Sequence, residues 1–401
     1  MDAQPLGRSG HMSTFLGKYL IVLGGFSEVT HDDGPLENVY VSTNELWIYD
    51  TEFEIWRMLP IDGRTPHFPP GLSGACAVLV DHYLYIYGGH SLEGHYGELH
   101  RLDLSSLSWE RVPCKGKRPA PRDKFVGWSH EGKLHFFGGF GVPFDEDPEV
   151  EVLHDNGSFL LNPGTMFSYQ ERGWNNQIII FDPETLVWSN PQYKGEPPSP
   201  RAAHAATKIG DKVWMFGGRH GLVRTAELHC LDLKKKTWSG SICAPGLWPC
   251  GRTWHSFTAI SQRQIFLYGG YTQYRKPLSD GWILDTELLQ WTQLDVPGNK
   301  PRLWHTACLN NYGEVMVFGG CQKDILDHDD NSDHSKEILT FCFTPPSLVR
   351  ICIKLAIDHK DILETEWGEL PKSLRGLLYS RSVRHRVGEQ TEQLQLITHG
   401  T

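Results

Sequence analysis

The sequence lacks the features that mark secreted, membrane-spanning and zinc-stabilised proteins. Its nine cysteines include no C-x-x-C pair, so neither a disulfide framework nor a zinc site is expected. No run of 18 apolar residues occurs, and the first residues have neither the basic start nor the apolar stretch of a signal peptide. We therefore expect a soluble intracellular protein without a membrane segment.

Excess positive charge and the common catalytic motifs are missing too. The chain has 38 Lys and Arg against 48 Asp and Glu, a net charge of −10, which disfavours binding to nucleic acid or an anionic membrane. It contains no Walker motif, no G-x-S-x-G and no H-E-x-x-H. The acidic segment Asp324–His334 has Ser332 where a calcium loop needs Gly, so we interpret it as a solvated loop. We predict no enzyme activity, no metal and no cofactor.

Glycine and aromatic residues, in contrast, are abundant together. The chain has 41 Gly, 14 Trp, 14 Tyr and 18 Phe. A disordered chain would have few aromatics, and a helical bundle would tolerate few glycines, each of which costs about 1 kcal/mol inside a helix. The composition favours many short strands joined by tight turns.

A strand-like run that ends in Gly-Gly occurs six times, and this repeat predicts the fold. A second apolar run follows each doublet, and in three units a Trp comes 21 or 22 residues after the first glycine. Such units resemble kelch repeats, which implies an all-β, six-bladed β-propeller over residues 1–343. The strand that closes the ring is not evident from the sequence. The doublets begin at Gly24, Gly88, Gly138, Gly217, Gly269 and Gly319.

Each repeat opens with a related group of four residues, here called the tetrad. Its first position is Arg in five units, and its fourth is His in four. Residues that recur in nearly every unit are expected to support the blades, and although four histidines suggest a metal site, a ring should spread them apart. These residues are Arg8, Arg122, Arg201, Arg252 and Arg302, with His11, His204, His255 and His305.

Positions that break the repeat are the candidates for binding. Only the fourth unit has a cation directly after Gly-Gly, Arg219, and Arg224 follows in the same loop. In a propeller, the loops after second strands and before first strands open at one face, so these side chains should surround one mouth. Arginine binds carboxylate or phosphate through paired hydrogen bonds, which suggests a small anion with an apolar body. Alternatively, either arginine pairs with an acid of its own loop. The candidates are Lys124, Trp174, Arg219, Arg224, Thr253 and Trp254.

Beyond residue 343 the pattern becomes helical. Ser347–Ile357 has apolar residues at helical spacing, and a second helix is expected over 370–378. The first resembles an elongin B/C-binding box and the second a cullin-2 box, so we assign residues 344–380 to a helical segment and 381–401 to a flexible tail. The alternative is that both helices simply pack under the propeller. The matching residues are Leu348, Cys352 and Ala356, then Leu370, Pro371, Leu374 and Leu378.

Nearly the whole chain resembles the family of kelch domain-containing proteins 1 and 2, through stretches such as PRDK, RGWN, PRAAHA, FGGR, PLSD and PRLWHTAC. The resemblance implies a non-catalytic substrate receptor of a cullin-RING ubiquitin ligase, with elongin B, elongin C, cullin-2 or cullin-5 and a RING subunit as partners. It also implies substrates with C-terminal Gly-Gly degrons and a location in nucleus and cytoplasm.

The same resemblance assigns roles within the mouth. It implies that Arg219 and Arg224 bind the terminal carboxylate, that Trp174 and Trp254 form walls, and that Lys124 faces the peptide backbone. Two positions depart from the family, because Thr253 replaces Ser and Phe140 replaces Tyr. A change in affinity or in the preferred upstream residue is therefore expected.

Two other functions stay open at this point. A kelch-type enzyme, such as a copper oxidase or a sugar-processing propeller, would need converging His, Tyr and Cys ligands or paired carboxylates at the mouth. A plain kelch scaffold would make the C-terminal boxes a coincidence. We also expect that the tail His399-Gly400-Thr401 can enter the pocket of a neighbouring molecule and cause self-association.

Overall fold

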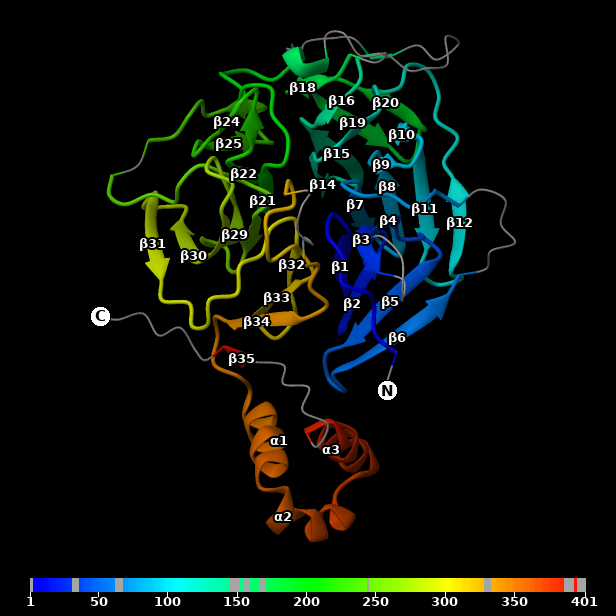
Figure 1. The fold of residues 1–401 in the computed structure, drawn as a ribbon, viewed down its shortest axis with the longest axis vertical. Coiled ribbons are helices and arrows are strands. Elements are labelled where there is room, and N and C mark those ends of the chain that lie inside the picture. Colours follow the sequence, from blue (N-terminus) through cyan, green and yellow to red (C-terminus); the bar gives the residue numbers. More distant parts are fainter. Residues whose placement is uncertain are drawn as a thin grey trace.

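The computed structural model describes residues 3–30, 36–61, 68–143, 152–153, 159–165, 171–243, 245–327, 333–385 and 393–394. Within them, six sheets stand around a common centre (Figure 1), which confirms the predicted propeller. Five of these sheets have four strands, and the fifth along the chain has five because the short strand β27 (Arg252–Thr253) also joins it. The four main strands of each sheet are called a blade, and among the described strands only β35 runs parallel to its neighbour. Blades 1 to 3 contain β1 (Met12–Leu16), β2 (Tyr19–Leu23), β5 (Glu45–Asp50) and β6 (Ile55–Pro60); β7 (Cys76–Val80), β8 (Tyr83–Tyr87), β11 (Leu99–Asp103) and β12 (Ser108–Arg111); and β14 (Val126–His130), β15 (Lys133–Phe137), β19 (Ile178–Asp182) and β20 (Val187–Ser189). Blades 4 to 6 contain β21 (Ala205–Ile209), β22 (Lys212–Phe216), β25 (Leu228–Asp232) and β26 (Thr237–Trp238); β28 (Ser256–Ala259), β29 (Gln264–Thr272), β30 (Pro277–Asp285) and β31 (Gln290–Leu294); and β32 (Thr306–Leu309), β33 (Glu314–Phe318), β34 (Ile338–Cys342) and β35 (Gln393–Leu394).

The hydrophobic core lies between neighbouring blades. Second strands such as β8 and β22 are buried over almost their whole length, because other blades cover both faces of them. The repeated tryptophans on the outer strands fill the same spaces. Trp188, for example, packs with Tyr87 of blade 2 and Phe136 of blade 3. The repeat of Gly-Gly and Trp is therefore a repeat of inter-blade packing.

Two rings of backbone hydrogen bonds join the blades and explain how the propeller closes. In the first, the N–H of each third tetrad residue donates to its equivalent in the preceding blade, at 2.7–2.9 Å. In the second, the N–H of each second glycine donates to the first tetrad residue of the next blade, at 2.8–2.9 Å. The bonds from Gly10 to Trp304 and from Gly320 to Arg8 link blade 1 to blade 6. Closure therefore requires no strand from the N-terminus.

The Gly-Gly doublets are needed because the next blade approaches them closely. At Gly217, φ is +69°, and a Cβ would lie 2.7 Å from the carbonyl oxygen of Arg252. Neither the conformation nor this space suits a side chain.

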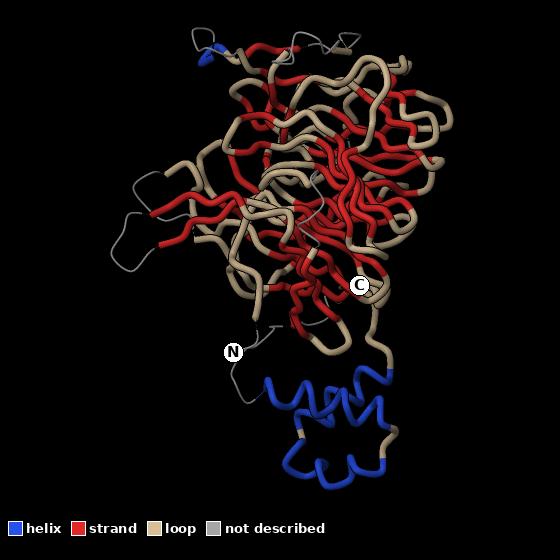
Figure 2. The backbone as a smooth tube through the Cα atoms, turned by 90° about the vertical axis from the view of Figure 1, so that its right-hand side faces the viewer, coloured by secondary structure: helices blue, strands red, loops and turns tan. Residues whose placement is uncertain are grey.

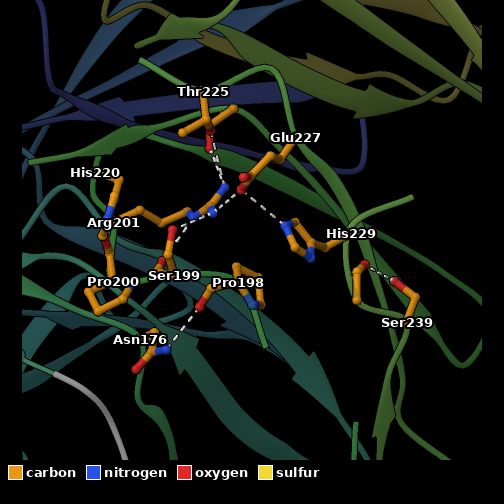
Figure 3. Close-up of polar contacts among 12 residues, drawn as sticks. Asn176, Pro198, Ser199, Pro200, Arg201, His220, Thr225, Glu227, His229 and Ser239 are labelled. Carbon is orange, nitrogen blue, oxygen red and sulfur yellow. Dashed lines mark hydrogen bonds and ion pairs between the residues drawn. The ribbon is translucent and has the colours of Figure 1, made fainter. Parts of the chain in front are cut away.

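The tetrad arginines support the same connections. Arg201 donates to the carbonyl of Gly217 at 3.0 Å, and its guanidinium is surrounded by Ser199, Thr225 and Glu227 (Figure 3). Three of the others make the equivalent bond to the first glycine of their own blade, and Arg302 binds Glu337 instead. All five are buried. The prediction that these arginines are structural is confirmed.

Short strands lie at one face of the propeller, where the Gly-Gly connections run; this face is called the mouth. They build the candidate site. They are β3 (Phe26–Thr30) with β4 (Leu36–Tyr40); β9 (His90–Ser91) with β10 (Gly94–His95); β13 (Arg122–Asp123) with β16 (Phe140–Gly141), β18 (Gly173–Asn175) and β17 (Phe159–Leu161); β23 (Arg219–His220) with β24 (Val223–Arg224); and β27 (Arg252–Thr253), which pairs with β29. A 3-10 turn, η1 (Pro163–Thr165), follows β17.

A helical segment lies outside the ring, beside blades 6 and 1 (Figures 1 and 2). It contains α1 (Leu348–Asp358), α2 (Lys360–Leu363), η2 (Glu364–Glu369) and α3 (Lys372–His385). Its small core consists of Ile353, Trp367 and Leu378. Arg350 pairs with Glu314 of blade 6, and Arg381 donates to the carbonyl of Glu52 in blade 1 at 2.6 Å. The segment is thus attached to two blades.

The C-terminal stretch differs from the expected flexible tail. Helix α3 extends to His385, and β35 adds two residues to the outer edge of blade 6. The expected tail contact through His399, Gly400 and Thr401 lies outside the described residues. Among the described helices, none is long and apolar enough to cross a membrane.

Candidate functional site at the propeller mouth

Six equivalent residue pairs surround the mouth. In each blade, the residue after Gly-Gly forms a β-bridge with the second tetrad residue. The positions singled out by comparing repeats therefore occupy one face, as expected. Only the fourth pair carries a guanidinium at this position. The pairs are Ser9 with Phe26, Ser73 with His90, Asp123 with Phe140, Ala202 with Arg219, Thr253 with Tyr271, and Leu303 with Cys321.

The third tetrad residues surround the centre of the mouth. Together with the fourth ones they line a cavity of about 140 Å³. All four of them that carry a side chain, Lys124, Ala203, Trp254 and Trp304, hold φ near +56°. Their left-handed backbone directs the N–H groups into the hydrogen-bonded ring. Lys124 and Trp254 thus reach the centre from blades 3 and 5, on either side of blade 4.

Arg219 and Arg224 lie opposite each other on the β23–β24 hairpin. The Nε of Arg219 donates to the carbonyl of Gly221 at 2.9 Å, and its guanidinium lies 5.4 Å from the ring centre of Trp174. The Nε of Arg224 donates to the Oγ1 of Thr253 at 3.2 Å. Within the described part of the chain, the terminal guanidinium nitrogens of both arginines form no hydrogen bond.

No acid among the described residues forms an ion pair with either arginine. The alternative that one of them pairs within its own loop is therefore not supported there. Tetrad arginines such as Arg201 and Arg252 do have acidic partners. Burial lowers the pKa of Arg219, and burial and the neighbouring Arg219 lower the pKa of Arg224. Two adjacent cations of this kind have the chemistry to bind an anion.

Lys124 is different, because it already has a partner. Its ammonium pairs with Asp123, which is only 1% exposed, and lies 5.3 Å from the ring centre of Trp304. Burial disfavours ionisation of Asp123, but Lys124 and His95 outweigh it and hold the pKa of the carboxyl down, to about 2. The sequence reasoning considered Lys124 and overlooked the acid beside it. Positive charge at the mouth is therefore concentrated on blade 4.

The structure assigns the aromatic candidates different positions. Trp254 is half-buried and stacks on Trp304, with ring centres 5.5 Å apart. Trp174 is buried beneath Arg219, and Thr253 is buried behind Arg224. Trp254 thus borders the open mouth, whereas the other two support the arginines from below.

Two residues that the sequence reasoning overlooked also support Arg224. The Oε1 of Gln273 accepts a hydrogen bond from the Arg224 N–H at 3.0 Å. The Arg224 guanidinium lies over Tyr271, 4.8 Å from the centre of the Tyr271 ring. The Tyr271 hydroxyl donates a hydrogen bond to Asp324. Asp324 belongs to the acidic segment that was interpreted as a solvated loop, so for this residue the interpretation was wrong. Asp324 is distant from Tyr271 in the sequence, so only the fold brings this carboxylate next to blade 5.

The four tetrad histidines all line the central cavity, each from a different blade. They nevertheless support the blades. A Cβ on Gly138 would lie 2.8 Å from the Cε1 of His204, which shows how tightly this ring packs against the preceding blade. Among the described residues, no three His, Cys, Asp or Glu side chains are arranged to hold a metal ion.

These buried histidines predict loss of stability in mild acid. Burial and Arg201 lower the pKa of His204 to about 3, and burial and Arg302 lower that of His305 equally far. An unfolded His titrates near 6.5, so below this pH the unfolded chain binds protons that the folded chain refuses. For the two residues together, the free energy of unfolding should fall by roughly 3 kcal/mol per pH unit below about 6.

Urea unfolding at pH 7.5, 6.0 and 5.0 measures this slope. The matched variant is His204→Gln with His305→Gln, whose slope should be smaller by about the same amount. A wild-type stability that is constant over this range, or an unchanged slope in the double variant, contradicts the assignment.

Known proteins provide an independent comparison. The KLHDC2/KLHL20/DRC7 Kelch-repeats domain model matches residues 1–139 and 166–320. Kelch domain-containing protein 2 of Bos taurus is 41% identical over 96% of this chain and 92% of its own. Kelch domain-containing protein 1 of Mus musculus is 36% identical over 92% of this chain and 88% of its own. The solved structure of YjhT, 15% identical, covers 85% of this chain and 96% of its own with a TM-score of 0.59, which supports the fold alone. The chain therefore belongs to the kelch-repeat family of kelch domain-containing proteins 1 and 2.

Proposed function

We propose that the protein is a substrate receptor that binds C-terminal peptides ending in Gly-Gly and presents them to a cullin-RING ubiquitin ligase. The observation that carries this proposal is the pair Arg219 and Arg224, held side by side without an acidic partner among the described residues. A chain-terminal carboxylate accepts two parallel hydrogen bonds from such a guanidinium. Capture of a terminal carboxylate is a recurring mode of peptide recognition.

Glycine at the end of the substrate suits the surroundings of the arginines. Trp254 and Trp304 stack at the centre of the mouth, and Trp174 fills the space below Arg219. A last residue without a side chain comes close to the guanidinium groups with least obstruction. An internal Gly-Gly lacks the carboxylate and is not expected to bind.

The exposed surface of the helical segment supports the ligase half of the proposal. Leu348 is 79% exposed, and Ile351, Cys352 and Leu355 share its side of α1 at helical spacing. Within the described residues, the propeller leaves this α1 face uncovered. If the helices served only to pack beneath the propeller, this apolar face would be expected to lie against it. Such an apolar face is typical of a protein interface. We assign it to elongin C in an elongin B/C complex.

The second box is partly internal. Leu378 belongs to the helical core, and Leu370 and Leu374 pack against that core, so only Pro371 is freely exposed. Ala356 of the first box also packs against it. We propose that these residues hold the surface that cullin-2, or cullin-5, and its RING subunit approach. Arg350 and Arg381 fix this surface relative to the mouth.

One titration tests the receptor half. A peptide ending in Gly-Gly is compared with the same peptide as its C-terminal amide. Loss of the carboxylate removes at least two charge-assisted hydrogen bonds of about 1.5–3 kcal/mol each, so the acid should bind at least about 100-fold more tightly. Equal affinities would reject carboxylate recognition and favour a plain kelch scaffold.

A further inference from the structure

Apolar side chains project at the hairpin tips beside the arginine pair. In the β23–β24 hairpin, Leu222 is 74% exposed and Val223 is 57% exposed. In the turn between β29 and β30, Tyr274 is 91% exposed. None of the three belongs to a core cluster, so folding does not explain why large apolar groups stand here.

The two tips are bonded together and form one surface. The Nε2 of Gln273 donates to the carbonyl of Leu222 at 2.9 Å, and its Oε1 accepts from the N–H of Arg224. Gln273 thus links blade 5 to blade 4 directly beside Tyr274. Leu222, Val223 and Tyr274 are called the apolar ridge.

A peptide bound as proposed would pass this ridge. Arg219 and Arg224 stand at the base of their hairpin and are paired with each other, and His220 and Val223 form the next pair toward its tip. The tip therefore lies about two residues, or roughly 7 Å, beyond the guanidinium groups. An extended peptide that starts at the arginines reaches this level with its third to fifth residues from the end.

We propose that the apolar ridge is a specificity subsite for apolar side chains at the third to fifth residues from the C-terminus of the substrate. The inference rests on the proposed function, because the terminal carboxylate sets the register of the peptide. Its occupant is the upstream part of the same peptide, since the ridge is continuous with the arginine hairpin. Contact with Leu222 and Tyr274 removes apolar surface of both partners from water.

The test uses two peptides that both end in Gly-Gly and differ only in Leu or Ser at the three positions upstream. Wild type should bind the Leu peptide roughly tenfold more tightly. The double variant Leu222→Ser with Tyr274→Ser should bind both peptides as wild type binds the Ser peptide. Leu288→Ser is the matched control, since Leu288 is also exposed but lies in the β30–β31 turn. Its preference should equal that of wild type.

The outcomes separate the two proposals. Equal binding of both peptides by wild type, or a tenfold preference that survives in the double variant, overturns the ridge. Equal binding of acid and amide forms overturns carboxylate capture instead. Thermal unfolding of each variant shows whether it is folded. Binding of the Ser peptide depends on the arginine pair and not on the ridge, so it distinguishes a general loss of binding from a loss of the preference for Leu over Ser.

Discussion

Replacing Arg219 with Ala should weaken binding of a Gly-Gly-ending peptide about 100-fold and leave binding of its amide almost unchanged. The guanidinium would form two charge-assisted bonds to the carboxylate, which together contribute roughly 3 kcal/mol. Arg219 is half-buried, and among the described residues its side chain donates one hydrogen bond, from Nε to the carbonyl of Gly221. Alanine keeps the backbone bonds with Ala202, so the fold should survive the substitution. Isothermal titration with both peptide forms measures the effect.

Arg219→Lys and Arg263→Ala complete this experiment. Lysine retains the charge but not the paired donors, so Arg219→Lys should give an intermediate affinity. Arg263 serves as the control. It lies in the turn between β28 and β29 and pairs with Asp285. If the two Arg219 variants bind the acid as wild type does, while the acid still binds more tightly than the amide, carboxylate capture lies elsewhere in the mouth.

Replacing Leu348 and Leu355 with Asp should abolish co-purification with elongin B/C. Both side chains lie on the exposed α1 face, and an unpaired carboxylate buried in an interface costs about 3 kcal/mol or more, so affinity should fall at least 100-fold. Neither residue contributes to the core formed by Ile353, Trp367 and Leu378, so the helices should still fold. Pull-down with purified elongin B/C measures the loss.

The matched control is Leu288→Asp, the same change at an exposed leucine of the propeller. It should retain the complex. Peptide affinity provides a second readout, because the α1 variants should bind the Gly-Gly peptide normally. Full elongin B/C binding by the α1 double variant would contradict the assigned interface and favour a helical segment that serves only the propeller.

Comparison among the six repeats predicted much of the site, because it separates residues shared by the blades from residues peculiar to one. It predicted that Arg201 is structural and that Arg219 binds a ligand. The structure buries Arg201 against Glu227 and places Arg219 at the mouth, where its role stays a prediction. The comparison did not find Asp123 or Gln273. Asp123 pairs with Lys124, the next residue in the chain, and Gln273 contacts Arg224 across a blade boundary. Neither contact recurs in the other units, so neither leaves a signal in the repeat itself.

The helical segment shows the same limit. Apolar spacing predicted both helices, yet it did not separate the exposed Leu348 from the buried Leu378, since both belong to apolar patterns. Only the packing of α3 against α1 and η2 decides which side chains are left to a partner.

By itself, the sequence determined the number of blades, the fold class and the family. Glycine conformation, inter-blade tryptophans and buried arginines are local requirements that recur in every unit, so each leaves a visible period. Tertiary structure alone decided how blade 1 closes onto blade 6, that Lys124 is neutralised while Arg219 and Arg224 have no acidic partner among the described residues, and that the tetrad histidines line one cavity. Ring closure and the shared cavity depend on contacts between residues far apart in the chain. The charge pairing at the mouth depends on the direction and burial of side chains, which the order of residues does not reveal even for the neighbours Asp123 and Lys124.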